Sequence, residues 1–125
     1  MNNRRSLLQE VQVIHDIDQP LFDAESVNAS AEIASGTIDV SVDKEVTLFI
    51  STTKAATVFV QLSNDETDDP DKAWYDLCNS SGTVLTFSLN NSKKAIPLSV
   101  KSIYMRVIVR NDDASNANVI TAGVI

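Results

Sequence analysis

Apolar side chains alternate with polar ones along residues 36–63, and this rhythm restricts the fold more than any other feature of the chain. The stretch reads GTIDVSVDKEVTLFISTTKAATVFVQLS. A strand with one buried face places an apolar residue at every second position. The polar or small breaks at residues 43–45 and 52–56 have the length of tight connections between antiparallel strands. The stretch therefore predicts a meander of three antiparallel strands.

Short strands are also expected along most of the remaining chain. Only 3 of the 125 residues are Gly and 3 are Pro, and the patterned segments are rich in Val, Ile, Thr and Ser, which is typical of β-rich domains. The predicted strands lie at residues 30–34, 37–42, 46–51, 57–63, 73–77, 83–89, 102–110 and 118–125, and Pro97 reduces residues 96–100 to an edge or irregular piece. About eight strands with little helical pattern between them predict one all-β domain, an antiparallel β-sandwich of jelly-roll or Ig-like type. The sequence leaves the choice between these two connectivities open.

Residues 1–26 differ from the rest of the chain. Leu7, Val11 and Ile14 keep helical spacing, whereas Val11 and Val13 fit a short strand, so both conformations stay open. This segment predicts an extended N-terminal arm that lies outside the sandwich.

The sandwich itself is then expected to span residues 27–125, and a partner subunit is expected to hold the arm. Pro20 would end any helix in it. One alternative is a frayed terminus, and another is a nucleic-acid contact through Arg4 and Arg5. The apolar arm residues expected at the interface are Leu7, Leu8, Val11, Ile14, Leu21 and Phe22.

The charge balance argues against a nucleic-acid partner. The chain has 17 Asp and Glu residues against 10 Lys and Arg residues, a formal net charge of −7, and such a field repels a phosphate backbone. No signal peptide and no membrane span are expected, because the apolar runs are too short for either. Cys78 is the single cysteine, so it is expected to be a small buried residue rather than half of an intrachain disulfide.

Catalytic and metal-binding motifs are not expected. His15 is the sole histidine, and it lies in the arm, far in sequence from Cys78, so neither a catalytic triad nor a zinc site can be assembled. The glycine-rich motifs that hold phosphates are missing as well. We therefore expect a protein that is not an enzyme and has no cofactor.

The acidic loop at residues 64–72, NDETDDPDK, is the one stretch rich in potential metal ligands. An EF-hand loop that began at Asp65 would need Gly at its sixth position and Glu at its twelfth. The chain has Pro70 and Asp76 there. The spacing predicts a solvated loop without a calcium ion.

Two adjacent aromatic residues, Trp74 and Tyr75, follow this loop. In a strand their side chains point to opposite faces, so we expect Trp74 to be buried in the core and Tyr75 to be exposed. The alternative is a platform on which a sugar ring stacks.

Phe49 and Phe59 lie on the face opposite the alternating apolar residues. If the turn is centred on Lys54, these two residues face each other across a hairpin. A pair of phenylalanines on a solvent face is an apolar patch that a soluble protein normally covers. We expect a neighbouring subunit to cover it, and the arm is the alternative.

Three segments resemble small virion proteins of tailed bacteriophages and related viruses, in which a β-sandwich is added to a capsid or tail. They read SGTIDVSVDKEVTLFISTTKAATVFVQLSND, AWYDL and SIYMRVIVRNDD, and together span residues 35–113. The resemblance implies a non-enzymatic structural role and a symmetric oligomer such as a trimer. It carries over no functional residue.

The expected function is therefore that of a structural or assembly protein, such as a virion decoration, cement or head/tail accessory protein. Its partners would be other copies of the chain and a capsid or tail protein. Its location would be the virion, assembled in the host cytoplasm. The alternative function is a carbohydrate-binding or adhesion module that uses Trp74 and Tyr75.

Overall fold

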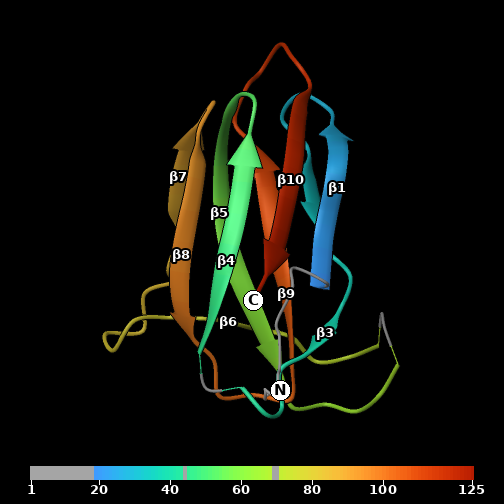
Figure 1. Ribbon diagram of the computed structural model, residues 1–125, viewed down its shortest axis with the longest axis vertical. Coiled ribbons are helices and arrows are strands. Elements are labelled where there is room, and N and C mark those ends of the chain that lie inside the picture. Colours follow the sequence, from blue (N-terminus) through green and yellow to red (C-terminus); the bar gives the residue numbers. More distant parts are fainter. Residues whose placement is uncertain (1–18, 44, 69–70) are drawn as a thin grey trace, which may run out of the picture.

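The computed structural model describes residues 19–43, 45–68 and 71–125, which form ten strands (Figure 1). These strands are β1 (Gln19–Val27), β2 (Glu32–Ala34), β3 (Ile38–Asp39), β4 (Glu45–Thr52), β5 (Ala55–Ser63), β6 (Tyr75–Asp76), β7 (Phe87–Asn90), β8 (Lys93–Ser99), β9 (Tyr104–Asn111) and β10 (Asn118–Val124). No helix occurs in these described ranges.

The strands form two antiparallel sheets. The first sheet has the order β1-β10-β4-β8, and in the second β9 lies between β5 and the short strands β2 and β3, while β6 and β7 pair with the other edge of β5. If β2 and β3 are taken as one interrupted strand and β6 as an insertion, eight main strands remain. Numbered along the chain, they are arranged 1-8-3-6 and 2-7-4-5, which is the connectivity of a jelly roll. The predicted antiparallel β-sandwich is confirmed, and the strand order selects the jelly roll over the Ig-like fold.

The core lies between the two sheets. Alternate residues of β4 and β5 point into it from opposite sides, as do those of β9 and β10. The largest side chains that are completely enclosed are Leu48, Met105 and Ile120. Burial of these aliphatic side chains is the main force that holds the sheets together.

The predicted three-strand meander is wrong. β4 belongs to the first sheet and β5 to the second, and β3 pairs with β9 rather than with β4. Only Thr53 and Lys54 separate β4 from β5, and they carry the chain from one sheet to the other. Strands that face one core from opposite sides have the same alternation as strands of a hairpin, so the pattern could not distinguish the two arrangements.

The predicted pairing of Phe49 with Phe59 is wrong for the same reason. Phe49 lies opposite Gly123 on β10 and Ala95 on β8, whereas Phe59 lies opposite Ile108 on β9. The two rings are therefore on the outer faces of different sheets.

The sandwich begins at residue 19 rather than at residue 27, because β1 pairs with β10 along its length. Phe22 is buried in the core and Leu21 packs against it, so both residues belong to the chain's own sandwich and not to an arm outside it. Two irregularities in the register, with Ala24 at a φ of +49°, interrupt the alternation of β1 and hid this strand from the sequence pattern. The other predicted arm residues, Leu7, Leu8, Val11 and Ile14, lie outside the described residues.

Asn118 fixes the crossing between the sheets. Its side-chain oxygen accepts hydrogen bonds from the backbone N–H groups of Thr53 and Lys54, both at 3.0 Å. Its amide nitrogen donates to the carbonyl oxygen of Ala55 at 3.1 Å and to the side-chain oxygen of Asn111 at 3.3 Å. The Asn118 side chain has no exposed surface, and it supplies the acceptor for the Thr53 and Lys54 N–H groups, which lie between the two strands.

Asn111 extends this buried network to the start of the fold. Its amide nitrogen donates to the carbonyl oxygens of Val27 and Asn28, each at 3.1 Å, and to that of Asn116 at 2.9 Å. The end of β1, the β4–β5 crossing and the β9–β10 connection therefore meet at two side chains.

Replacing Asn118 with Ala should lower the free energy of unfolding by about 2–4 kcal/mol, because the N–H groups of Thr53 and Lys54 would lose their acceptor and the buried Asn111 side chain would lose a donor. Chemical denaturation monitored by circular dichroism measures the loss. Asn90→Ala is the matched control, since Asn90 is exposed on β7, and a change within about 0.5 kcal/mol is expected there. Equal losses in the two variants would contradict the role assigned to Asn118.

Candidate functional site

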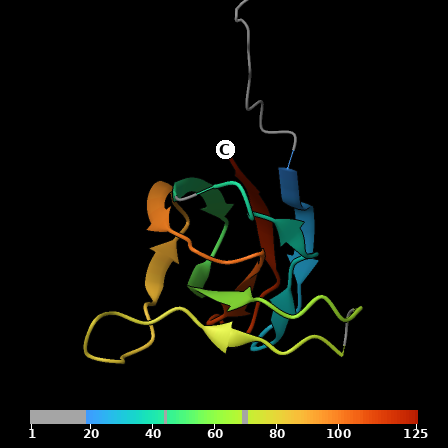
Figure 2. The same ribbon diagram turned by 90° about the horizontal axis from the view of Figure 1, so that it is seen from below.

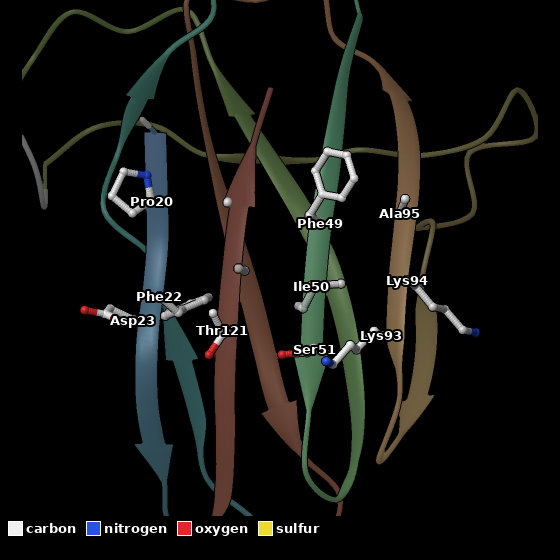
Figure 3. Close-up of a pocket in the computed structure, with 12 residues that line it drawn as sticks. Pro20, Phe22, Asp23, Phe49, Ile50, Ser51, Lys93, Lys94, Ala95 and Thr121 are labelled. Carbon is white, nitrogen blue, oxygen red and sulfur yellow. The ribbon is translucent and has the colours of Figure 1, made fainter. Parts of the chain in front are cut away.

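The outer face of the first sheet carries an apolar groove centred on Phe49 (Figure 3). The strand register places Pro20, Gly123, Phe49 and Ala95 in one row across all four strands. Directly opposed residues of antiparallel strands point to the same face. Because the neighbours of Phe49 in this row are small, its ring stands above them, and 37% of its surface is exposed.

The groove has a volume of about 650 Å³. Its next row across the sheet is polar and contains Thr121, Ser51 and Lys93, and Asp23 adds a carboxylate to the lining. Lys94 borders the groove at the start of β8, but its side chain points away (Figure 3), and its ammonium group donates to the carbonyl oxygen of Ser88 at 2.9 Å. An apolar centre with a polar rim is typical of a docking surface for another molecule.

Apolar surface continues from the groove toward the C-terminal end of β10. Ile125 exchanges two backbone hydrogen bonds with Thr47, and Thr47 lies opposite Pro97 on β8. Ile125 and Pro97 are both exposed. Apolar residues of the first sheet thus extend from Phe49 to this end of the strands, with polar residues such as Thr47 between them.

The outer face of the second sheet is polar by comparison. Arg110 donates to a carboxylate oxygen of Asp112 at 2.8 Å, and the Thr57 hydroxyl donates to the other oxygen at 2.6 Å. The Thr57 hydroxyl and the arginine hold the pKa of Asp112 below its ordinary value. Phe59 is half-buried on this face.

Trp74 lies on the polar second sheet and not in the core, so that prediction is wrong. Its ring is half-buried and stacks on the guanidinium group of Arg106, 4.4 Å from the ring centre. Arg106 in turn donates to Gln61 at 2.7 Å, and Gln61 donates to Asp76 at 3.0 Å. The side chains of Trp74 and Tyr75 do point in different directions, but the Trp74 ring lies against Arg106 on the outer face of the second sheet.

Tyr75 is exposed as predicted, with 69% of its surface open to solvent. Tyr75 belongs to β6, where it lies opposite Leu62 of β5. β6 has only two residues and lies at an edge of the second sheet. Figure 2 looks along the long axis of the sandwich and shows β6, drawn in yellow, beside β5, with the loops that flank β6 extending along that side of the molecule. Cys78, in the same segment, is half-buried rather than fully buried, and its thiol lies 3.4 Å from the carbonyl oxygen of Asp76.

The acidic loop is organised around a lysine of its own. Lys72 is only 8% exposed, and its ammonium group donates to the carbonyl oxygens of Asp65 and Thr67, the latter at 2.6 Å. The same ammonium group lies 4.0 Å from the centre of the Tyr104 ring. The sequence pattern had drawn attention to the carboxylates and missed this cation, whose position depends on the folded loop.

Asp65 closes the loop from the other side. Its carboxylate accepts hydrogen bonds from the hydroxyl and the backbone N–H of Thr67 and from the backbone N–H of Ala73. These bonds, led by the Thr67 hydroxyl, lower the pKa of Asp65 to about 2, and Lys72 adds a smaller attraction. Within the described ranges, no group of three or more His, Cys, Asp or Glu side chains could hold a metal ion.

Comparison of the chain with protein-family models, with curated proteins and with solved structures found no match. Among the described residues, no helix is long and apolar enough to cross a membrane. The assignment of a function therefore depends on the surfaces of the molecule itself.

Millimolar calcium should leave the melting temperature unchanged relative to EDTA, because the Lys72 ammonium group already occupies the carbonyl oxygens at the centre of the loop. A bound ion would stabilise the native state by mass action. Differential scanning calorimetry in the two buffers makes the comparison, and a reproducible rise of several degrees in calcium would contradict the prediction.

The amide signals of Thr67 and Ala73 should titrate with a midpoint near pH 2 rather than near the ordinary value of 3.8. Because folding lowers the pKa of Asp65, its stabilising contribution is complete above about pH 4 and is lost as the pH falls toward 2. Heteronuclear NMR between pH 6 and pH 1.5 follows both signals. A midpoint at the ordinary value would show that the carboxylate does not hold the loop.

Proposed function

We propose that this protein is a non-enzymatic structural module that assembles through protein–protein contacts, of the kind that decorates, cements or completes a virion. The observation that carries the proposal is the apolar groove around Phe49, which is exposed on a sheet of four strands. Its partners are other copies of the chain and a capsid or tail protein, and its location is the virion, after assembly in the host cytoplasm.

The chemical composition of this surface favours the binding of a macromolecule over catalysis. The residues at the middle of the groove, Phe49, Gly123, Ala95 and Pro20, carry no ionisable or nucleophilic group. An exposed apolar patch of this kind usually marks a contact with another protein. A sheet also holds its side chains more rigidly than a loop does, which lowers the entropic cost of association.

Fold-level analogy points in the same direction. Jelly rolls are widespread in viral capsid proteins and in lectins. The strands that resemble phage virion proteins include β4, β5 and β9, which lie at the centre of the two sheets. Since a fold hosts many functions, this analogy supports the proposal without deciding it.

A carbohydrate-binding module is the second candidate, supported by the exposed ring of Tyr75. Sugar-binding platforms combine an aromatic ring with polar groups that meet the hydroxyls. Here Arg106 already occupies a face of the neighbouring Trp74 ring, so one exposed tyrosine is left for stacking. This arrangement favours assembly over sugar binding.

The wild-type chain should form an oligomer in solution, and Phe49→Ser should weaken its association by about 2 kcal/mol, roughly thirtyfold in the dissociation constant. The reason is that the exposed ring of Phe49 is the largest apolar group of the groove. Analytical ultracentrifugation over a range of concentrations measures the constant.

Phe59→Ser is the matched control, because it removes the same ring from the outer face of the other sheet. It should leave the dissociation constant unchanged, and melting curves establish that both variants are folded. A monomeric wild-type protein that binds a glycan array, with binding lost in Tyr75→Ala, would replace the proposed function with the carbohydrate alternative.

A further inference from the structure

The Phe49 groove reaches the point at which the described part of the chain begins. Pro20 lines the groove, and Gln19 is the first described residue. We propose that the groove is filled by residues 7–17 of a second copy of this chain. This inference rests on the proposed function and names the contact through which the copies assemble.

Residues 7–17, LLQEVQVIHDI, have the composition that the groove requires. Six of these eleven residues are aliphatic: Leu7, Leu8, Val11, Val13, Ile14 and Ile17. An extended segment advances roughly 3.3 Å per residue, and four strands about 4.8 Å apart form a surface that seven or eight such residues can cross. The segment is therefore apolar enough and long enough to cover the ring of Phe49 and the small residues around it.

Charge offers the same occupant one contact at the rim. Lys93 lines the groove and is exposed at the start of β8, whereas the Lys94 ammonium group donates to the carbonyl oxygen of Ser88. Asp23 on β1 lines the opposite side of the groove. The N-terminal segment carries Glu10 and Asp16 among its aliphatic residues, and Asp18 follows it. Opposite charges at the rim of an apolar contact fix its register and direction.

Sequence and topology favour a second copy over the chain's own groove. Residues 4–19 contain no Gly, Pro or Asn, and the turn-forming residues among them are Ser6, Asp16 and Asp18. Pro20 restricts Gln19 to an extended conformation, and Gln19 is already paired with Val124 in β1. A return across the chain's own sheet would therefore need a reversal within residues 16–18, whereas insertion into a second copy needs none.

Two pairs of full-length variants and a cross-linking experiment test the inference. Val11→Ser with Val13→Ser should raise the dissociation constant of the oligomer at least about tenfold, as Phe49→Ser does, because both remove apolar contact from one interface. The controls Gln9→Ser with Gln12→Ser and Phe59→Ser should leave the dissociation constant unchanged.

For cross-linking, a Val13→Cys chain is mixed with an Ala95→Cys chain of different mass, both carrying Cys78→Ser, and the mixture is treated with a short bifunctional maleimide.

Cross-linked pairs that contain one chain of each mass, together with the loss of association in the Val11/Val13 variant, would support the inference. If Phe49→Ser dissociates the oligomer while the Val11/Val13 variant does not, the groove binds another surface and the inference fails while the proposed function stands. If a chain that carries both cysteines links only to itself, the segment fills its own groove and the inference fails. A wild-type chain that is monomeric at every concentration would overturn both proposals.

Discussion

The fold depends on how the chain satisfies its backbone where it crosses from one sheet to the other between β4 and β5. Two residues make this crossing, and the N–H groups of Thr53 and Lys54 lie outside both hydrogen-bonding ladders. Asn118 accepts from both, and Asn111 connects it to the end of β1. Without these buried amides the partly buried N–H groups of Thr53 and Lys54 would have no acceptor in the protein. The separation of β4 from β5 in turn puts Phe49 and Phe59 on opposite outer faces.

Strand positions and core residues were readable from the sequence, because the period of two depends only on which face of a strand is buried. The alternation correctly marked Leu48, Val58 and Val60 as core. Sheet membership was not readable, since both sheets bury their inner faces in one core. The strand β1 was not predicted from the sequence, because its irregular register moves Phe22 and Val27 out of a simple alternation.

The candidate site was only partly predictable. Phe49 was singled out by its place on the solvent face, but the groove also needs Gly123 and Ala95, which are distant in the sequence and meet Phe49 only through the strand order. A glycine inside a strand is a signal of close approach by another group, and Gly123 carried that signal. Lys72 shows the opposite case, because a lysine in an acidic stretch gives no sign that it will be buried at the centre of the loop.

The two outer faces of the sandwich have unlike character, and this asymmetry gives the molecule a direction. Apolar contact area is available around Phe49 on one of these faces, so a surface that the molecule covers would meet that face. Here the face around Phe49 is apolar, and the opposite face is covered by groups such as Arg110 and Asp112 that remain hydrated. Pro97 and the lysines of β8 also keep the margin of the first sheet from accepting a further strand. A subunit that docked through the Phe49 face would therefore turn the hydrated face, with Arg110 and Asp112, toward the surroundings.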